Sequence, residues 1–453
     1  MVKVSVPGIV VALALTACSG TSSSGGGGGA ATGGGSATGG GAATGGGAAT
    51  GGGSATGGGS ATGGGGGTSA CPNGDMLNAL GKPKLMIGGT YPDSVDSMAQ
   101  WDLRYLYISG GLFDGTGPCA SCANSCTSNA HSCNNAGGGC AWWGCYQFDQ
   151  NPPGEYVRDF VSAAKAKGEI PMFTYYELLQ ASMVNEGTAE IDKLTDATFL
   201  GKYFADWRFL LQQVGQEKAL LHIEPDLWGY GMMKNANPHQ SPASVQTANP
   251  TDCSTQENSL AGFGKCMVAM VHKYAPNAKV GLHASAWATG IDVSLNTDAS
   301  FDVVAEANKV GDFLAACGGS DADMLVVETS DRDAAYYQIV RGENRWWDKT
   351  NATLPNFTQH FTWAKALSEK VGRPLLWWQM PVGNESLDNS VNHYRDNRLD
   401  YFFDHMDQVA AAHGFGVAYG SGAPDQTDPS TDMGHLVSRL GAYKTAGGQN
   451  ACP

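Results

Sequence analysis

Eight short apolar runs recur along the chain, and helical patterns follow most of them. The runs cover residues 84–91, 103–109, 170–178, 219–226, 279–287, 324–329, 374–381 and 415–420. The helical patterns cover residues 155–167, 198–216, 260–274, 301–316, 357–371, 397–413 and 435–444. Strands that alternate with helices of this length predict a parallel sheet, and eight such units predict a closed (β/α)8 TIM barrel. The alternative, an open doubly wound sheet, normally has a longer Gly-rich turn after its first strand than residues 87–91 provide.

The first 70 residues are expected to lie outside this fold. Residues 1–18 predict a signal peptide, because their apolar stretch is too short to span a bilayer. Leu15-Thr16-Ala17-Cys18 resembles a bacterial lipobox, which implies lipidation of Cys18; an ordinary secretory signal is the alternative. Lipoproteins with Ser rather than Asp after the cysteine are usually sent to the outer membrane, and Ser19 resembles this pattern. We therefore expect a protein that is lipid-anchored to the bacterial outer membrane, or extracellular. Residues 19–70, rich in Gly, Ala, Thr and Ser, predict a disordered linker, and residues 71–453 a catalytic barrel domain.

The net charge of the chain is −15 at pH 7. A surface of this sign argues against nucleic acid or anionic lipid as a partner. We therefore expect membrane contact only through the N-terminal anchor. We further expect the protein to be a monomer.

Cysteine usage is typical of an exported protein. Six cysteines fall in a stretch that has almost no apolar residues to build a core: Cys119, Cys122, Cys126, Cys133, Cys140 and Cys145. Three disulfides would stabilise such a stretch, and a metal site with His131 nearby is the alternative. The further expected pairs are Cys253 with Cys266 and Cys71 with Cys452, which leaves Cys317 free and buried.

Polar side chains gather at the ends of the predicted strands, where barrel enzymes build their active sites. The fourth run ends in His222, Glu224 and Asp226, which strand alternation would place on one face. By the same alternation His283, Ser285 and Trp287 would share a face of the fifth strand. Further residues at or after strand ends are Glu177, Glu328, Asp331, Asp333, Trp377, Trp378, Gln379 and Tyr419.

Carboxylates beside Trp and Tyr residues suggest carbohydrate chemistry, because sugars stack on aromatic rings and bond to carboxylates. Cleavage of a glycosidic bond needs one carboxylic acid and one carboxylate. We assign Glu224 as the general acid and Glu328 as the base or nucleophile, tuned by Asp226 and Asp331. The expected sugar platforms are Trp228, Trp287, Trp377 and Trp378, with His283, Gln379, Glu177 and Tyr419 as further substrate contacts.

Several of these residues have a structural alternative. Glu224 could be a carboxylate held by a basic residue such as Arg332, and Asp331 and Asp333 compete with Glu328 for its role. His222 is expected to be a hydrogen-bonded core residue rather than a ligand or base.

The pattern resembles secreted TIM-barrel glycoside hydrolases over residues 80–445. Ile223-Glu224-Pro225-Asp226 is similar to the Ile-Glu-Pro-Asp of the inverting cellobiohydrolase and endoglucanase family. Ser330-Asp331-Arg332-Asp333 is similar to that family's Pro-Asp-Arg-Asp, whose first Asp is the general acid, although the two motifs stand here in the reverse order. In the retaining clan of barrel glycosidases a strand-four Glu, matched by Glu224, is the acid/base. That clan's nucleophilic Glu on strand seven is replaced here by Gln379, with Glu385 the nearest carboxylate beyond it.

Two other functions remain open. Gln379 in place of a carboxylate favours a non-catalytic surface glycan-binding protein. A metal-dependent hydrolase, such as a deacetylase or phosphodiesterase, could use Asp226, His283 and Glu328 as ligands. No motif indicates a nucleotide or haem, and we expect no metal or other cofactor.

Overall fold

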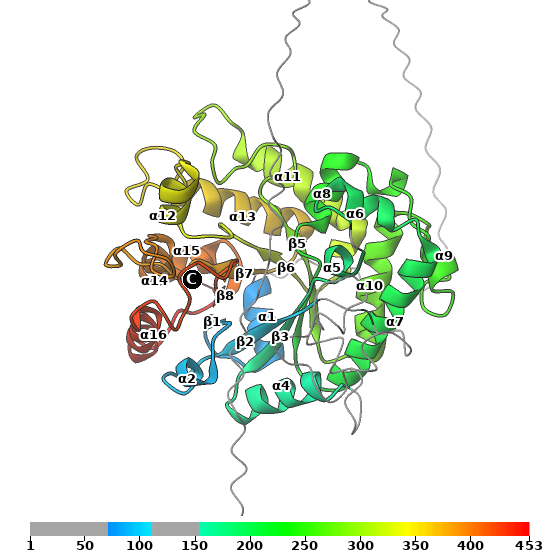
Figure 1. Cartoon of the computed structure of the whole chain (residues 1–453), viewed down its shortest axis with the longest axis horizontal. Helices are drawn as coiled ribbons and strands as arrows, with labels where there is room; N and C mark the ends of the chain where they lie inside the picture. The colour runs from blue at the N-terminus through cyan, green and yellow to red at the C-terminus, as the bar shows by residue number, and fades with distance from the viewer. Residues whose placement is uncertain (1–70, 110–111, 113–153, 183, 453) are drawn as a thin grey trace, which may run out of the picture. The chain divides into compact units, whose positions relative to one another are not determined.

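All eight apolar runs form strands, and the strands pair in chain order into a closed parallel barrel (Figure 1). The computed structural model describes residues 71–109, 112, 154–182 and 184–452. The predicted (β/α)8 barrel is confirmed, because β1 also pairs with β8 and closes the sheet. The strands are β1 (Met86–Gly89), β2 (Leu103–Ile108), β3 (Ile170–Tyr175), β4 (Leu220–Ile223), β5 (Lys279–Ala284), β6 (Met324–Val327), β7 (Leu375–Met380) and β8 (Gly414–Tyr419).

Helices surround the barrel, as Figure 1 shows. Several begin at a residue whose side chain caps the free N–H groups of the first turn: Asp196 accepts hydrogen bonds from the amides of Thr198 and Phe199 at 3.1 and 3.0 Å. The α-helices are α1 (Pro72–Leu80), α2 (Asp93–Asp96), α4 (Glu155–Ala166), α5 (Leu178–Ser182), α6 (Thr188–Lys193), α7 (Ala197–Val214), α8 (Leu227–Lys234), α9 (Val245–Ala248), α10 (Leu260–Tyr274), α11 (Val303–Leu314), α12 (Ala334–Tyr336), α13 (Phe357–Val371), α14 (Arg398–Asp404), α15 (Met406–Ala411) and α16 (His435–Thr445). A 3-10 turn (Pro238–Gln240) and two π-helical turns (Ala315–Gly319 and Tyr337–Arg341) complete the described helical structure.

The alternation along each strand decides which side chains face the barrel interior. His222 on β4 contacts Trp378 on β7 across the interior, with ring centroids 4.7 Å apart. Tyr175 faces outward and packs on Trp207 of α7, with ring centroids 4.7 Å apart. The inward set lines the interior up to the mouth of the barrel, by which we mean the end formed by the carboxyl ends of the strands.

The two ends of the described chain meet at the opposite end of the barrel. A disulfide joins Cys71 to Cys452, and the Asn73 amide donates hydrogen bonds to the carbonyls of Gly414 and Ala451 at 3.0 and 2.7 Å. A second disulfide joins Cys253 to Cys266, whereas Cys317 is free and buried. Both expected pairs and the free cysteine are therefore confirmed.

The structure departs from the sequence-based prediction in two places. Strand β4 ends at Ile223, and Glu224 and Asp226 have positive φ angles of 46° and 65°, so the predicted alternation does not continue past the strand. The helix predicted over residues 397–413 is two helices, α14 and α15, which meet at His405.

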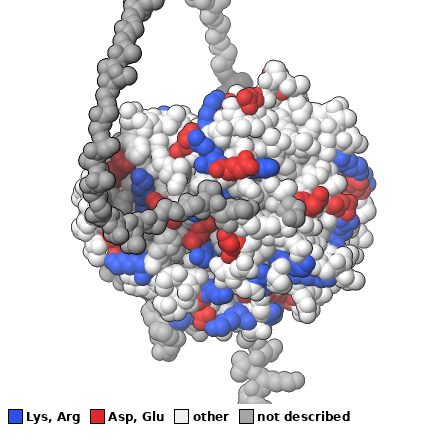
Figure 2. Space-filling model, turned by 180° about the vertical axis from the view of Figure 1, so that it is seen from behind, with Lys and Arg blue, Asp and Glu red and all other residues white. Residues whose placement is uncertain are grey.

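Some predictions fall on parts of the chain outside the described residues. They concern the signal peptide over residues 1–18, lipidation of Cys18, the linker over residues 19–70 and the six cysteines between 119 and 145. Within the described ranges, no helix combines the length and apolar character that a membrane span requires. Figure 2 shows acidic and basic side chains interspersed over the face seen from behind.

Candidate functional site

Two histidines on adjacent strands, His222 on β4 and His283 on β5, lie side by side in the barrel interior. Thr174 Oγ1 lies 3.3 Å from His222 Nδ1, and His222 Nε2 lies 3.1 Å from His283 Nδ1. The edge of Trp378 packs against both rings, with centroids 4.7 and 5.7 Å away. Burial, and then the neighbouring His283, lower the pKa of His222 well below its ordinary value. His222 is thus a neutral, hydrogen-bonded core residue, as expected.

His283 of this pair lies beside two carboxylates in the mouth. His283 Nε2 lies 3.8 Å from Glu328 Oε1, and one polar atom from each of Asp226, His283 and Glu328 lies within 4.8 Å of the others. Asp226 is half-buried, and the Glu328 side chain is 16% exposed. Burial, and then the charge of Glu328, raise the pKa of Asp226 well above its ordinary value.

Glu224 faces another part of the structure. Its Oε1 accepts hydrogen bonds from the Tyr203 hydroxyl at 2.6 Å and from the amides of Glu177 and Leu178 at 3.1 and 2.9 Å. These donors belong to α7 and to the start of α5, and Glu224 is fully buried. Burial raises the pKa of Glu224 to about 8. Tyr203 and backbone amides therefore hold this carboxyl, whereas Arg332 pairs with Asp331.

The charges of the two carboxylates act on two tyrosines: Tyr107, which sequence reasoning misses, and Tyr176, which the sequence places at the end of the third strand. The pKa of Tyr107 on β2 is raised well above its ordinary value by burial and, among other charges, by Glu328 and Asp226. The pKa of Tyr176, just after β3, is raised by burial and then by Asp226. The Tyr107 hydroxyl donates a hydrogen bond to Gln379 Oε1. The alternation of Tyr105 and Tyr107 in the second apolar run is the signal that could have identified Tyr107.

The remaining predicted residues divide between the mouth and the outer core. The structure brings Asp226, His283 and Glu328 together, with Trp378 beside the His283 ring and Gln379 bonded to Tyr107. Trp287 lies beside α8, where its ring centroid is 4.8 Å from that of Tyr230. Asp331 follows β6, pairs with Arg332, accepts a hydrogen bond from the Tyr337 hydroxyl, and its charge contributes to raising the pKa of Asp226.

Four predicted sugar contacts are instead packed away from the mouth. Trp228 is buried and donates from Nε1 to the Ile223 carbonyl at 3.0 Å. Trp377 faces outward and donates to Nε2 of His360 on α13 at 2.9 Å. The ring of Tyr419 stacks on Phe403 of α14 with centroids 5.6 Å apart. Glu177 is fully buried, and its backbone amide donates a hydrogen bond to Glu224 Oε1.

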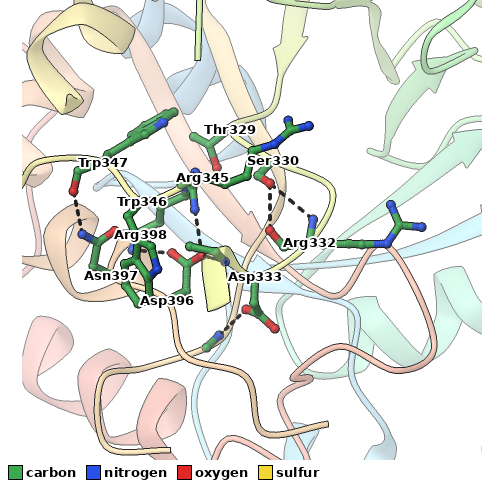
Figure 3. A network of polar contacts seen from close by, with 12 residues as sticks. Thr329, Ser330, Arg332, Asp333, Arg345, Trp346, Trp347, Asp396, Asn397 and Arg398 are labelled. Atoms are coloured by element: carbon green, nitrogen blue, oxygen red, sulfur yellow. Dashed lines mark hydrogen bonds and ion pairs between the residues drawn. The ribbon is translucent and has the colours of Figure 1, made fainter. Parts of the chain in front are cut away.

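A buried network ties together the loops that surround the mouth (Figure 3). The two Asp333 oxygens accept hydrogen bonds from the amides of Gly383 and Thr427 at 3.0 and 2.9 Å, which joins the loops after β6, β7 and β8. Asp396 accepts from the Ala334 amide and from Arg398, both at 2.7 Å. Burial, and then the charge of Asp396, raise the pKa of Asp333.

Comparison with models of protein families finds no match, and comparison with curated proteins finds none either. Among solved structures, the chain is similar to an endo-β-1,4-mannanase from Thermotoga petrophila, with 12% identity, 81% of this chain and 78% of that chain covered, and a TM-score of 0.44. A Bacteroides ovatus GH5 xyloglucanase has 12% identity over 77% of this chain and 66% of that chain, with a TM-score of 0.39.

The endoglucanase Cel6 from Mycobacterium tuberculosis is also similar, with 13% identity over 53% of this chain and 62% of that chain, and a TM-score of 0.25. At these identities and TM-scores the likeness concerns the barrel alone. The site therefore has to be interpreted from its own residues.

Proposed function

We propose that the protein is a glycoside hydrolase that cleaves a polysaccharide or oligosaccharide at the mouth of the barrel. The observation that carries the proposal is the convergence of the Asp226 and Glu328 carboxyls from the ends of β4 and β6. Glycosidic cleavage uses one carboxyl group to protonate the leaving oxygen and a second to activate water or attack the sugar. The proposal gives Asp226 the place that the sequence assigned to Glu224, because Glu224 is turned toward α7.

Aromatic groups near the carboxylates support a sugar as the substrate. Tyr107 is partly exposed and lies in the same part of the barrel interior as the buried Trp378, with ring centroids 5.8 Å apart. Tyr230 and Trp287 make a second pair on the β4 and β5 side. A sugar presents a C–H face to such rings and hydroxyl groups to carboxylates and amides. This combination favours a carbohydrate over a nucleotide or an apolar ligand.

The test is the release of reducing ends by the purified protein from a panel of soluble glycans that includes mannan and xyloglucan. Wild-type protein is expected to cleave at least one glycan. Glu328→Gln and Asp226→Asn are expected to lower kcat by at least about a hundredfold, since each removes one partner of the acid/base pair. Glu385→Gln is the matched control, because Glu385 is exposed and pairs with Lys349. Unchanged cleavage by Glu328→Gln would overturn the assignment.

A second candidate function is glycan binding without turnover. The observation in its favour is Gln379, an amide at the end of β7 whose Oε1 accepts a hydrogen bond from Tyr107. Binding of a glycan from the same panel, unaffected by Glu328→Gln but lost in Trp378→Ala, would decide for this function. Cleavage by the wild-type protein would exclude it.

We also propose that Cys18 carries a lipid that anchors the protein to the bacterial outer membrane. The Leu15-Thr16-Ala17-Cys18 sequence supports the proposal. Radiolabelled palmitate should be incorporated into the full chain expressed in a bacterial host, and Cys18→Ser should abolish the label and release the protein from the membrane fraction. Labelling that persists in Cys18→Ser would contradict the proposal.

A further inference from the structure

Three side chains from consecutive strands meet at the mouth, and each offers an atom that can bind a metal ion. His283 lies on β5, Asp226 follows β4 and Glu328 follows β6. One polar atom of each lies within 4.8 Å of the other two. From this geometry we propose that Asp226, His283 and Glu328 bind a divalent cation. The inference rests on the same site as the proposed glycoside hydrolase, but it concerns a second state of that site. A carboxyl that binds the cation cannot also protonate a leaving oxygen or attack the sugar, so the cation-bound form should not cleave glycans and removal of the cation should restore cleavage.

The free nitrogen of His283 points to a ligand independently of the carboxylates. His283 is fully buried, and its Nε2 has no hydrogen-bond partner among the described residues. This nitrogen is directed at Glu328, whose Oε1 is 3.8 Å away. A buried nitrogen without a partner is costly. A cation between His283 and the carboxylates would satisfy it.

The other ring nitrogen of His283 is held in the way that metal ligands usually are. Its Nδ1 lies 3.1 Å from His222 Nε2, and His222 Nδ1 lies 3.3 Å from Thr174 Oγ1. In the tautomer that could bind a metal, His283 Nδ1–H donates to His222 Nε2, and His222 Nδ1–H donates to Thr174 Oγ1. Such outer hydrogen bonds fix the tautomer that leaves Nε2 with a lone pair for the metal.

The charge around the cluster also favours a cation. Asp226 and Glu328 are two carboxylates held close together, and the charges of Glu186 and Asp331 also act on Asp226. A divalent cation would neutralise the repulsion between the two carboxylates. Binding would require both of them to be ionised, so cation and protons would compete for the site.

The ligand set indicates the class of cation. One imidazole and two carboxylates suit Zn²⁺ or Mn²⁺ better than Ca²⁺, which prefers an all-oxygen shell. Ligands at about 2.0–2.1 Å from a tetrahedral ion lie about 3.3 Å apart. The His283–Glu328 separation of 3.8 Å is near this value, and the Glu328 side chain is partly exposed, so a cation between them would require a small movement of that side chain. Three protein ligands would leave a position open for water or substrate.

The test measures metal binding to the full chain after treatment with a chelator. Titration calorimetry and elemental analysis should detect one Zn²⁺ or Mn²⁺ per chain. Asp226→Asn, His283→Gln and Glu328→Gln should each weaken binding by more than about tenfold, and Glu385→Gln should not. Mn²⁺ is included because it has little affinity for thiolates, which guards against binding by the cysteines between 119 and 145. No binding of either ion, or binding that all three variants retain, would overturn the inference.

A second measurement needs no variant, in case a substitution prevents folding. In ¹⁵N NMR spectra of the wild-type protein, the His283 imidazole resonances should shift when Zn²⁺ is added, with Nδ1 remaining protonated. Unchanged His283 resonances at saturating Zn²⁺ would contradict the inference. Cation binding together with no cleavage by the cation-free protein would overturn only the proposed function, and full cleavage by chelator-treated protein that binds no metal would overturn only this inference.

Discussion

The hydroxyl of Tyr203 lies 2.6 Å from Oε1 of Glu224. This hydrogen bond directs Glu224, the residue that the sequence suggests as the general acid, toward helix α7. Two backbone amides at the start of α5 donate to the same oxygen. A carboxyl with three donors on one oxygen holds α5, β4 and α7 together. Glu224 therefore has a structural role, and the reacting groups of the proposed hydrolase are Asp226 and Glu328.

Substitutions at Glu224 are accordingly predicted to act on stability. Tyr203→Phe removes one buried hydrogen bond and should lower the free energy of unfolding by about 1–2 kcal/mol. Glu224→Ala leaves three donors without an acceptor and should cost more, about 3 kcal/mol or above. Urea unfolding measures both. A Glu224→Ala protein with wild-type stability and no glycan cleavage would instead return Glu224 to a catalytic role.

Glu190 is predicted to make the stability depend on pH. It is 1% exposed, and burial, with a smaller contribution from Glu186, raises its pKa from 4.5 to about 7 in the folded protein. The folded state therefore binds the proton more tightly than the unfolded state does. This contribution is fully present below about pH 4.5 and is lost as the pH rises through 7.

Glu190→Gln tests this dependence, because it keeps an oxygen that can accept from the Gly187 amide, now 2.8 Å from Oε1. Between pH 5 and pH 8 the wild-type protein should lose about 1–3 kcal/mol more stability than the variant does. The measurement is urea unfolding at a series of pH values. Parallel curves for the two proteins would show that Glu190 titrates normally in the folded state.

The barrel could be predicted from the sequence because its signal is repeated eight times. Each apolar run is short and is followed by polar residues. A misplaced boundary in one predicted strand therefore leaves the prediction of the fold unchanged. Residues directly at strand ends, such as Glu328 and Gln379, were placed near the mouth for the same reason. The Cys71–Cys452 pair was also predictable, since the two cysteines lie at the ends of the barrel domain.

The orientation of single side chains could not be predicted in the same way. Glu224 turns because it has a positive φ angle and accepts from Tyr203, which is 21 residues away on α7. No local pattern indicates such a turn at a glutamate. Trp377 and Trp378 are adjacent on β7, so one must face outward and one inward. Flanking residues are apolar on both faces of this buried strand, and only the packing of the barrel decides that Trp378 faces inward.

The two disulfides are predicted to contribute unequally to stability. The Cys71–Cys452 bond spans 381 residues and the Cys253–Cys266 bond spans 13. A cross-link that closes a longer loop removes more entropy from the unfolded chain. Replacing Cys71 and Cys452 by Ser should therefore lower the Tm more than replacing Cys253 and Cys266, and calorimetry compares the two. Equal or reversed losses would argue that local packing, rather than loop closure, sets these contributions.

The buried Asp333 is predicted to hold the loops around the mouth in one arrangement (Figure 3). Its two oxygens satisfy the amides of Gly383 and Thr427, so Asp333→Ala leaves two buried donors unpaired at a cost of about 1–3 kcal/mol each. Hydrogen exchange at these amides should become faster as well, because the loops after β7 and β8 lose their common acceptor. Asp388→Ala is the control, since Asp388 is exposed and, among the described residues, its side chain accepts hydrogen bonds only from Ser390 of its own loop. If both variants leave the exchange of the Gly383 and Thr427 amides unchanged, the three loops hold their arrangement without Asp333.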